Sequence, residues 1–478
     1  MNGLSSAQHD RAVGALVGLA VGDALGAGYE FTTPGPSDPQ MIGGGGFGWE
    51  PGEWTDDTQM AICIARVLET GSVDVDRIGE GFLEWYRSSP KDVGNMTRAV
   101  LSRAKAGADL HSAAARYYEG HPHSAAGNGS LMRTAPVALA FLERPDRELM
   151  EIAMSVSALT HADPQAQEAC AIWCLGIKYA VLDATFEGVQ GALELMPSES
   201  KATWTKLRDE AETRSPMDFT GNGYVVRALQ AAWSAITQTD QGKEFPCLHL
   251  QVALKTAVSI GDDTDTVGAI TGMLVGARWG GSAIPALWTE RLHGWPDWSH
   301  GRLARSAQLI TRGGESDENG WPSGESMIDH YANVWKARGT YVSLPQDPGV
   351  AIGDALALRN DDLSADVVVS LCRMGTSDVK ATQHHVIHMI DAPGRDQNPN
   401  LRFLIKDLAS SIVRWRAAGR TVFVHCVGAQ SRTPTLAAAS LCESLGLSGS
   451  EALEEVRELL PRMSPNAEFT GVVKELWP

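Results

Sequence analysis

Apolar residues recur at helical spacing through about the first 310 residues of the chain. Segments rich in Ala, Leu and Met are interrupted by Gly, Pro and Asn, and few runs alternate between apolar and polar positions. Apolar positions three and four residues apart are typical of helices that bury one face. We therefore predict a mostly α-helical N-terminal part, with clear helices at residues 58–69, 92–106, 168–181 and 266–279.

One further apolar segment, residues 12–29, is long enough to be compared with a membrane or signal segment. It contains Asp23 and many glycines, and neither a basic leader nor a convincing cleavage site accompanies it. We predict a buried helix there, and we expect a cytoplasmic protein without a membrane segment.

The pattern changes after residue 312. Residues 313–336 are polar and rich in glycine, which is typical of a linker. Strand-like runs then appear at residues 366–372, 386–390 and 421–424, each followed by a loop and a helical pattern. We predict a multidomain chain with an all-α domain at residues 1–312, the linker, and a smaller α/β domain at residues 337–478.

Composition narrows the possible functions. A content of 43% hydrophobic and 21% charged residues is that of an ordinary globular protein. The net charge of -18, without a basic stripe, argues against general nucleic-acid binding. The seven cysteines are odd in number and lack a zinc-binding pattern, so a reducing compartment fits better than a disulfide framework.

A His-Cys pair ends the third strand-like run. Cys426 is followed by five residues, and then by Arg432 and Thr433. A cysteine between a strand and a helix lies where backbone N–H groups and the helix dipole stabilise anions, which favours the nucleophilic thiolate. The planar fork of an arginine can bind a phosphate through two hydrogen bonds.

This motif resembles the signature of the dual-specificity branch of the protein-tyrosine phosphatases. The resemblance implies hydrolysis of phosphate esters through a phosphocysteine intermediate, without a metal. It also implies that His425 orients the loop and that Thr433 completes it. A loop aspartate after a strand then serves as the general acid. Asp391 directly follows the run 386–390, whereas Asp396 matches the spacing of many family members, and the sequence leaves both open.

Two distant segments combine carboxylates with hydroxyls in front of a helical pattern. A helix start needs one capping residue, and each segment has more than one. Packed into one cleft, these carboxylates repel each other unless some are protonated or a cation lies between them. Their hard oxygen atoms suit magnesium or manganese. The residues are Thr55, Asp56, Asp57, Asp263, Asp265 and Thr266.

These segments resemble the ADP-ribosylglycohydrolase family of the dinitrogenase-reductase-activating type, as does the glycine-rich run around Asp23 that is followed by Glu30. The resemblance implies an all-α fold, two Mg²⁺ or Mn²⁺ ions held by the six Asp and Thr residues, and a catalytic Glu30 beside them. It implies cleavage of the glycosidic bond between ADP-ribose and a protein side chain or small acceptor. Asp262 departs from the pattern, because many members have glycine there, and this leaves the metal preference open.

Three other stretches extend this resemblance. Asp92 lies in a stretch tied to ribose ring opening in arginine-directed members, although a helix N-cap is the other interpretation. Glycines in the loop that begins at residue 127 let the backbone approach a pyrophosphate, whose charge needs N–H donors. The resemblance implies that the substrate-binding residues are Gly127, Asn128, Gly129, Ser130, Met132 and His161.

We predict a bifunctional hydrolase that joins metal-dependent removal of ADP-ribose to cysteine-dependent phosphatase chemistry. The expected partners are an ADP-ribosylated protein or small molecule and a phosphorylated substrate. In one alternative the C-terminal domain only binds phosphate or ADP-ribose, and in another the helical domain occludes a partner protein. The sequence leaves open the ADP-ribose acceptor, the phosphatase substrate and the oligomeric state.

Overall fold

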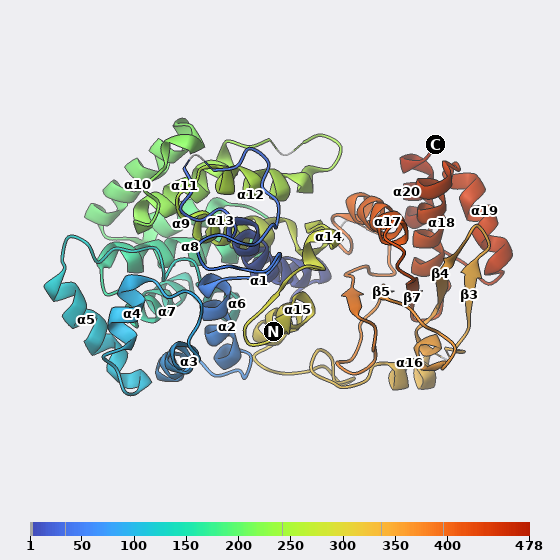
Figure 1. Cartoon of the computed structure of the whole chain (residues 1–478), viewed down its shortest axis with the longest axis horizontal. Helices are drawn as coiled ribbons and strands as arrows, with labels where there is room; N and C mark the ends of the chain where they lie inside the picture. The colour runs from blue at the N-terminus through green and yellow to red at the C-terminus, as the bar shows by residue number, and fades with distance from the viewer. Residues whose placement is uncertain (1–2, 34, 241, 336, 395) are drawn as a thin grey trace. The chain divides into compact units, whose positions relative to one another are not determined.

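The computed structural model describes residues 3–33, 35–240, 242–335, 337–394 and 396–478 (Figure 1). Contacts divide the chain into two compact units. The helical unit comprises Arg11–Ile284 and Arg291–Glu315, and the α/β unit comprises Met1–Asp10, Pro285–Glu290 and Ser316–Pro478. Within the described ranges, no helix has both the length and the apolar character that a membrane span requires.

The helical unit confirms the prediction of a mostly α-helical N-terminal part. The predicted helix at residues 92–106 is shorter in the structure, because the backbone N–H groups of Lys105 and Ala106 bind the Asp109 carboxylate at 3.0 Å and start a separate turn. The helices of the helical unit are α1 (Ser6–Gly26), α2 (Asp56–Leu68), α3 (Val75–Arg87), α4 (Asn95–Leu101), α5 (Leu110–Gly120), α6 (Ala135–Ala140), α7 (Asp146–Ala158), α8 (Pro164–Asp183), α9 (Glu187–Leu195), α10 (Ser198–Thr213), α11 (Val225–Thr237), α12 (His249–Ser259), α13 (Thr264–Trp279) and α15 (His300–Ile310).

Helices α1 and α13 pack backbone against backbone along a row of glycines. A Cβ atom added at Gly22 would lie 2.0 Å from the carbonyl oxygen of Gly268, so no larger residue fits there. The same close approach recurs one turn apart along both helices, and at the C-terminal end of α1 it involves Gly26 and Thr264. The end of α1 therefore lies against the start of α13. The glycines of this row are Gly14, Gly18, Gly22, Gly26, Gly268, Gly272 and Gly276.

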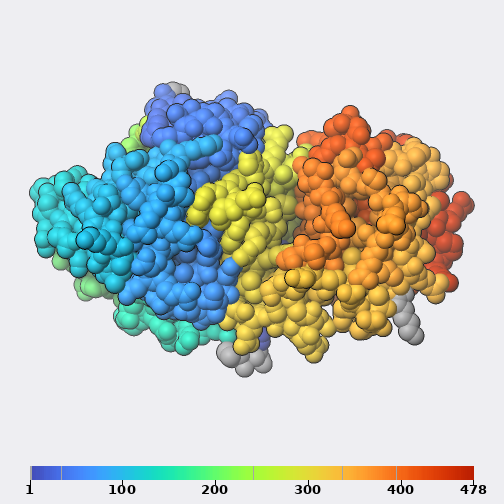
Figure 2. Space-filling model, turned by 60° about the horizontal axis from the view of Figure 1, so that its bottom comes forward, coloured from blue at the N-terminus to red at the C-terminus, as the bar shows by residue number. Residues whose placement is uncertain are grey.

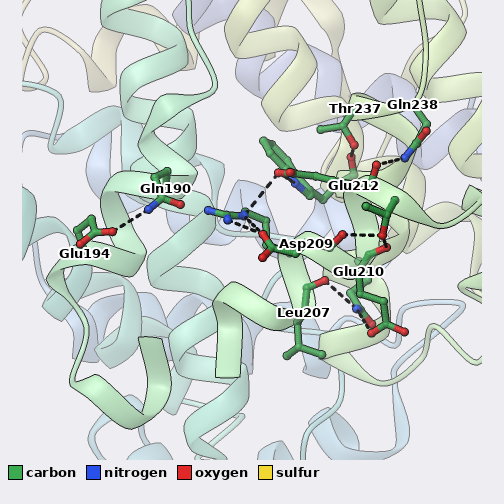
Figure 3. A network of polar contacts seen from close by, with 12 residues as sticks. Gln190, Glu194, Leu207, Asp209, Glu210, Glu212, Thr237 and Gln238 are labelled. Atoms are coloured by element: carbon green, nitrogen blue, oxygen red, sulfur yellow. Dashed lines mark hydrogen bonds and ion pairs between the residues drawn. The ribbon is translucent and has the colours of Figure 1, made fainter. Parts of the chain in front are cut away.

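A polar network joins α10 to α11 (Figure 3). Trp233 on α11 donates its indole N–H to Glu212 at 3.0 Å. Asp209 forms an ion pair with Arg208 on the same helix, and its side chain is 56% exposed. Asp209 is thus a solvated carboxylate outside both acidic segments.

The α/β unit contains one five-stranded sheet in the order β3-β4-β7-β5-β6. β4, β7, β5 and β6 run parallel, and β3 pairs antiparallel with β4 at the edge. All five residues of the central strand β7 are buried. The strands are β3 (Tyr341–Leu344), β4 (Asp347–Asp354), β5 (Val367–Ser370), β6 (Gln383–Val386) and β7 (Val422–Cys426), and the helices are α14 (Ala286–Thr289), α16 (Ile328–Val334), α17 (Leu401–Ala417), α18 (Arg432–Leu445), α19 (Gly449–Leu459) and α20 (Ala467–Leu476).

The predicted strand at residues 386–390 is wrong in position. β6 ends at Val386, where the predicted run begins. The backbone of Ile390 is bound instead by the Asn398 side chain, which accepts from its N–H at 2.8 Å and donates to its carbonyl at 2.9 Å. An asparagine amide thus takes the place of a neighbouring strand, and Asp391 lies on a loop five residues beyond β6.

Part of the predicted linker is folded. Within residues 313–336, α16 carries Ile328 and Tyr331 into a small buried cluster of the α/β unit together with Cys372 and Met374. The hydroxyl of Tyr331 also donates to the backbone oxygen of Arg373 at 2.6 Å. The domain limits that we predicted remain a prediction.

Candidate active sites

The two acidic segments meet at the N-terminal ends of α2 and α13. Asp57, in the first turn of α2, is 1% exposed, and Asp265, in the first turn of α13, is 2% exposed. Asp57 accepts a hydrogen bond from Thr55 at 3.1 Å and another from Thr266 at 3.4 Å, so it connects both segments. Helix N-termini favour negative charge, which offsets part of the cost of burying these carboxylates.

A buried carboxylate on α1 organises the start of α2. Asp23 is fully buried and accepts hydrogen bonds from the backbone N–H of Thr55 at 2.9 Å and from that of Thr58 at 3.0 Å. The hydroxyl of Thr58 donates to the same carboxylate at 2.5 Å. Burial raises the pKa of Asp23 to about 6. We had not predicted this role, although a lone acidic residue in an apolar, glycine-rich helix was a usable signal.

Three carboxylates form the centre of the site. Ligand oxygens of Glu30, Asp263 and Asp265 all lie within 4.8 Å of one another. Burial, followed by repulsion from Asp263, raises the pKa of Glu30 to about 9. Burial and then the Glu30 charge raise the pKa of Asp265 well above its usual value.

The donor set fits a divalent cation. Oxygen Oε2 of Glu30 and oxygen Oδ1 of Asp57 are buried without a hydrogen-bond partner. Burial raises the pKa of Asp56 and of Asp57 well above the usual value, and neighbouring carboxylates add to both shifts. Buried acceptors that lack donors are rare in proteins, and a hard cation with oxygen ligands would satisfy them.

Asp92 faces the same cluster. Burial raises its pKa, and the Asp263 charge adds to the shift. Asp92 in turn contributes to the raised pKa values of Glu30 and Asp56. Its role in ring opening remains a prediction.

The loop from residue 127 reaches the cluster through Asn128. The side-chain amide of Asn128 donates to the Asp263 carboxylate at 2.8 Å, and Met132 accepts a weak bond from Thr266 at 3.8 Å. Ser130 points elsewhere, because its hydroxyl accepts from Ser157 at 2.8 Å. Substrate binding by this loop remains a prediction.

His161 packs directly against this loop. A Cβ atom at Gly129 would lie 3.2 Å from the imidazole, which is a tight contact, and one at Gly127 would lie 3.6 Å from it, which is an ordinary van der Waals contact. Burial and the nearby Arg133 charge hold the pKa of His161 well below its usual value, so the ring is neutral. Arg133, which is fully buried, donates to Thr160 at 2.6 Å, and Thr160 contacts the imidazole at 2.7 Å. The sequence pattern does not indicate this role of Arg133.

Asp262 does not join the central carboxylates. Its side chain accepts hydrogen bonds from the hydroxyl of Thr33 and from the backbone N–H of Gly221, the latter at 2.6 Å. The residue therefore connects two loops beside the site rather than adding a ligand oxygen to the Glu30–Asp263–Asp265 group.

The second site lies in the α/β unit, at the C-terminal end of β7. Cys426 ends the strand and is 2% exposed, and Arg432 begins α18 after a five-residue loop. The guanidinium Nη1 of Arg432 donates to the backbone oxygens of Leu371 at 2.5 Å and Met389 at 3.2 Å. Its Nε atom is buried without a hydrogen-bond partner, which fits an arginine prepared for an anionic ligand.

His425 is held behind the loop. Its Nε2 lies 2.6 Å from the hydroxyl of Ser370, which also lies 2.9 Å from Nε2 of His384. Burial lowers the pKa of His425 to about 4, so the ring is neutral at pH 7. Thr433 is buried and donates weakly to the backbone oxygen of Gly353 at 3.4 Å. The positioning role of His425 and the part of Thr433 remain predictions.

The two candidate acids differ in their surroundings. Asp391 accepts a hydrogen bond from the Ser431 hydroxyl at 2.6 Å and lies 3.8 Å from Nε of Arg432. Both carboxylates are exposed on the same loop, and the Asp391 side chain is 40% exposed. Contact with the loop that carries Arg432 favours Asp391 as the acid, and the assignment remains a prediction.

The chain thus combines a helical unit that holds an acidic centre with an α/β unit that carries a cysteine-arginine loop. Residues 4–319 match the family model for ADP-ribosylglycohydrolase, and residues 356–476 match that for the dual specificity phosphatase catalytic domain. The chain belongs to the ADP-ribosylglycohydrolase family, and it carries a domain of the dual specificity phosphatase type at its C-terminal end.

The chain is similar to relatives of known name. The chain is 34% identical over 293 residues to ADP-ribosyl-(dinitrogen reductase) glycohydrolase from Rhodospirillum rubrum, which covers 59% of this chain and 90% of the relative. It is 32% identical over 295 residues to ADP-ribosylarginine hydrolase Tri1 from Serratia proteamaculans, covering 59% of this chain and 75% of the relative. A solved ADP-ribosylglycohydrolase-related protein complex matches with a TM-score of 0.50 and 30% identity over 65% of this chain and 99% of that chain. The predicted family and fold class are thereby confirmed.

Proposed function

We propose that the helical unit hydrolyses the glycosidic bond of ADP-ribosylated substrates and needs divalent metal, Mg²⁺ or Mn²⁺, to do so. The observation that carries this proposal is the convergence of Glu30, Asp263 and Asp265 within 4.8 Å, with the Glu30 oxygen Oε2 buried and unpaired. Carboxylates at this separation repel strongly, and a cation between them removes the repulsion.

The residues of both helix starts have distinct parts in this proposal. Thr55, Asp56, Asp57, Asp263, Asp265 and Thr266 would hold the metal, which supplies positive charge and Lewis acidity beside the sugar. Asn128 orients the Asp263 carboxylate through its amide, and Asp23 fixes the backbone that carries Thr55. Glu30 and Asp92 lie beside this metal-binding set and also have raised pKa values, and we assign to them the exchange of a proton with water or the leaving group.

We propose ADP-ribosylated arginine as the first substrate to test. The name of the relative from Serratia proteamaculans specifies an ADP-ribosylarginine hydrolase, and the chain covers 75% of that relative. Hydrolysis adds the hydroxyl of water to the ribose carbon and a proton to the departing guanidine nitrogen.

The metal proposal predicts a matched pair of outcomes. Asp263→Asn removes one of the three converging carboxylates. The rate of ADP-ribose release should therefore fall by at least about 100-fold, and the thermal stabilisation by Mn²⁺ should fall to near zero. Asp209→Asn, which neutralises a solvated carboxylate on α10, should leave both unchanged (Figure 3). The measurements are release from ADP-ribosylarginine with Mn²⁺ or excess chelator, and thermal shift. Full activity in chelator would contradict the proposal.

We also propose that the α/β unit is an active phosphatase. The Cys426 thiolate attacks phosphorus, the bond from phosphorus to the ester oxygen breaks, and Asp391 or Asp396 protonates that oxygen. Water then attacks the phosphocysteine, the same carboxylate takes its proton, and phosphate leaves with the thiolate restored. The buried Nε of Arg432 has no hydrogen-bond partner and lies 3.8 Å from the Asp391 carboxylate, so it is available to a phosphate, which supports phosphate binding.

The phosphatase proposal predicts that Cys426→Ser abolishes p-nitrophenyl phosphate hydrolysis measured without metal. Asp391→Asn should lower turnover by about 100-fold if it is the acid, and Asp396→Asn should then leave it nearly unchanged. Arg432→Lys keeps the charge but loses the fork, so turnover should collapse as well. Binding of vanadate without any turnover in the wild type would instead favour a non-catalytic phosphate-binding module.

A further inference from the structure

Two residues with left-handed backbone meet beside the metal-binding carboxylates. Phe31 has a φ angle of +64° and Asp262 one of +61°. The backbone N–H of Phe31 donates to the carbonyl of Asp262 at 2.6 Å, and the N–H of Asp262 donates to Thr32 at 2.9 Å. Left-handed backbone is costly for residues other than glycine and is found where the surroundings enforce it.

The Asp262 side chain adds two contacts to this backbone pair. One carboxylate oxygen accepts from the Thr33 hydroxyl, and the other accepts from the N–H of Gly221 at 2.6 Å. A single side chain thus connects the segment after α1 with the loop before α11. In Figure 2 the segment after α1, drawn in blue, lies at the surface, and Phe31, Thr32 and Thr33 are exposed.

One connected segment carries Glu30 of the acidic centre, and the other carries Asn222, which binds the backbone of Asp263. Glu30 directly precedes Phe31, and Asn222 directly follows Gly221. The Asn222 side chain accepts from the N–H of Asp263 at 2.9 Å, and its amide donates to the carbonyl of Gly261 at 3.1 Å. Movement of either segment would therefore change the spacing of Glu30 and Asp263.

We propose that Asp262 is a positioning residue that clamps residues 30–33 to Gly221 and so holds Glu30 and Asp263 at metal-binding distance. This inference rests on the proposed function of the helical unit. Glycine would adopt the backbone conformation of residue 262 with less strain. Aspartate is more strained at this position, and only the contacts of its carboxylate offset the strain. The clamp acts through other residues and supplies no ligand itself.

Asp262→Gly tests the clamp directly, because glycine accepts a φ of +61° and the fold should persist. In metal-free protein, hydrogen exchange of the peptide containing residues 29–33 and of Gly221 should be about tenfold faster, since two hydrogen bonds to a charged group are lost. Asp262→Asn keeps one acceptor and should fall between glycine and the wild type.

The same variants should separate metal binding from folding. The Kd of Mn²⁺, measured by calorimetry, should rise about tenfold in Asp262→Gly, and excess Mn²⁺ should restore release from ADP-ribosylarginine. Asp209→Asn is the matched control and should change neither value.

A double-mutant cycle identifies the contact that carries the effect. Asp262→Gly and Thr33→Val should be non-additive in exchange rate, because they remove the same hydrogen bond. Thr32→Val should be additive, because the Thr32 hydroxyl binds Tyr29 within its own segment at 2.5 Å.

The outcomes distinguish the clamp from the proposed function. If the wild type bound no Mn²⁺, the proposed metal dependence would fail, and the exchange data would still decide whether the clamp exists. If the wild type bound Mn²⁺ and Asp262→Gly matched it in affinity and exchange, the clamp would be overturned.

Discussion

Because its carboxylates are buried, we expect a metal ion to stabilise the helical unit as well as to take part in catalysis. Asp57 and Asp265 are almost fully buried, and burial raises their pKa values well above normal. Keeping these groups ionised without a cation is costly, because desolvation and mutual repulsion act in the same direction. The site is thus held together by structure around it, including the clamp at Asp262.

His425 makes the α/β unit sensitive to acid. Burial lowers its pKa to about 4, whereas an unfolded histidine titrates near 6.5. Between these values the unfolded state binds more protons, so stability present above pH 6.5 is lost as the pH falls toward 4, by up to about 3 kcal/mol.

Asp407, also in this unit, shifts in the opposite sense, since burial raises its pKa to about 6. The contribution of His425 to the pH dependence of stability is therefore obtained by comparing the wild type with His425→Asn. The free energy of opening of β7, measured by hydrogen exchange from pH 7 to 4, should fall less steeply in the variant. Parallel curves would contradict the assignment.

At the scale of elements, both sites lie where helices begin. The acidic residues occupy the first turns of α2 and α13, and Arg432 occupies that of α18. Unpaired N–H groups at these ends stabilise carboxylates in the first case and would stabilise phosphate in the second.

The contact between α1 and α13 should be intolerant of any side chain. Gly22→Ala places a Cβ atom 2.0 Å from the Gly268 carbonyl, so we expect a loss of about 3 kcal/mol or more in the free energy of unfolding. Gly191→Ala, in α9, meets nothing closer than 3.9 Å and should stabilise by about 0.5–1 kcal/mol. Urea denaturation of the two variants measures both effects, and equal stabilities would refute the tight contact.

At the scale of the whole molecule, the chain consists of two units, each with its own candidate site. We propose that the activities are separable at the polar stretch near residue 315. The choice of the cut then matters for the α/β unit, because α16 contributes Ile328 and Tyr331 to its buried cluster.

A fragment beginning at residue 316 should therefore be more stable than one beginning at residue 337. Losing the three buried side chains of Met327, Ile328 and Tyr331 and the Tyr331 hydrogen bond should cost several kcal/mol, roughly 1.5–3 kcal/mol for each side chain. Both fragments lack Pro285–Glu290, so the comparison isolates residues 316–336. Thermal unfolding and p-nitrophenyl phosphate hydrolysis measure the difference, and equal melting temperatures would show that α16 is dispensable.

Local patterns predicted the parts whose signal lies in adjacent residues. The helices α2, α8 and α13, the strands β5 and β7 and the loop between Cys426 and Arg432 follow from periodicity and spacing. The strand expected at residues 386–390 was misplaced, because nothing local shows that Asn398 binds the backbone of Ile390. Helix α4 is shorter than predicted for a similar reason, because the Asp109 carboxylate accepts hydrogen bonds from backbone N–H groups beyond the end of the helix.

The sequence by itself determined the chemistry that each segment can offer: hard oxygen donors at two helix starts, and a thiol and an arginine around one loop. Only the tertiary structure decided which of these groups meet. The close approach of α1 and α13 brings Glu30 to Asp263 and Asp265, and it directs Asp262 to Thr33 and Gly221. The physical reason is that electrostatic repulsion and hydrogen bonding depend on distances through space, which residues far apart in the chain acquire only when the helices pack.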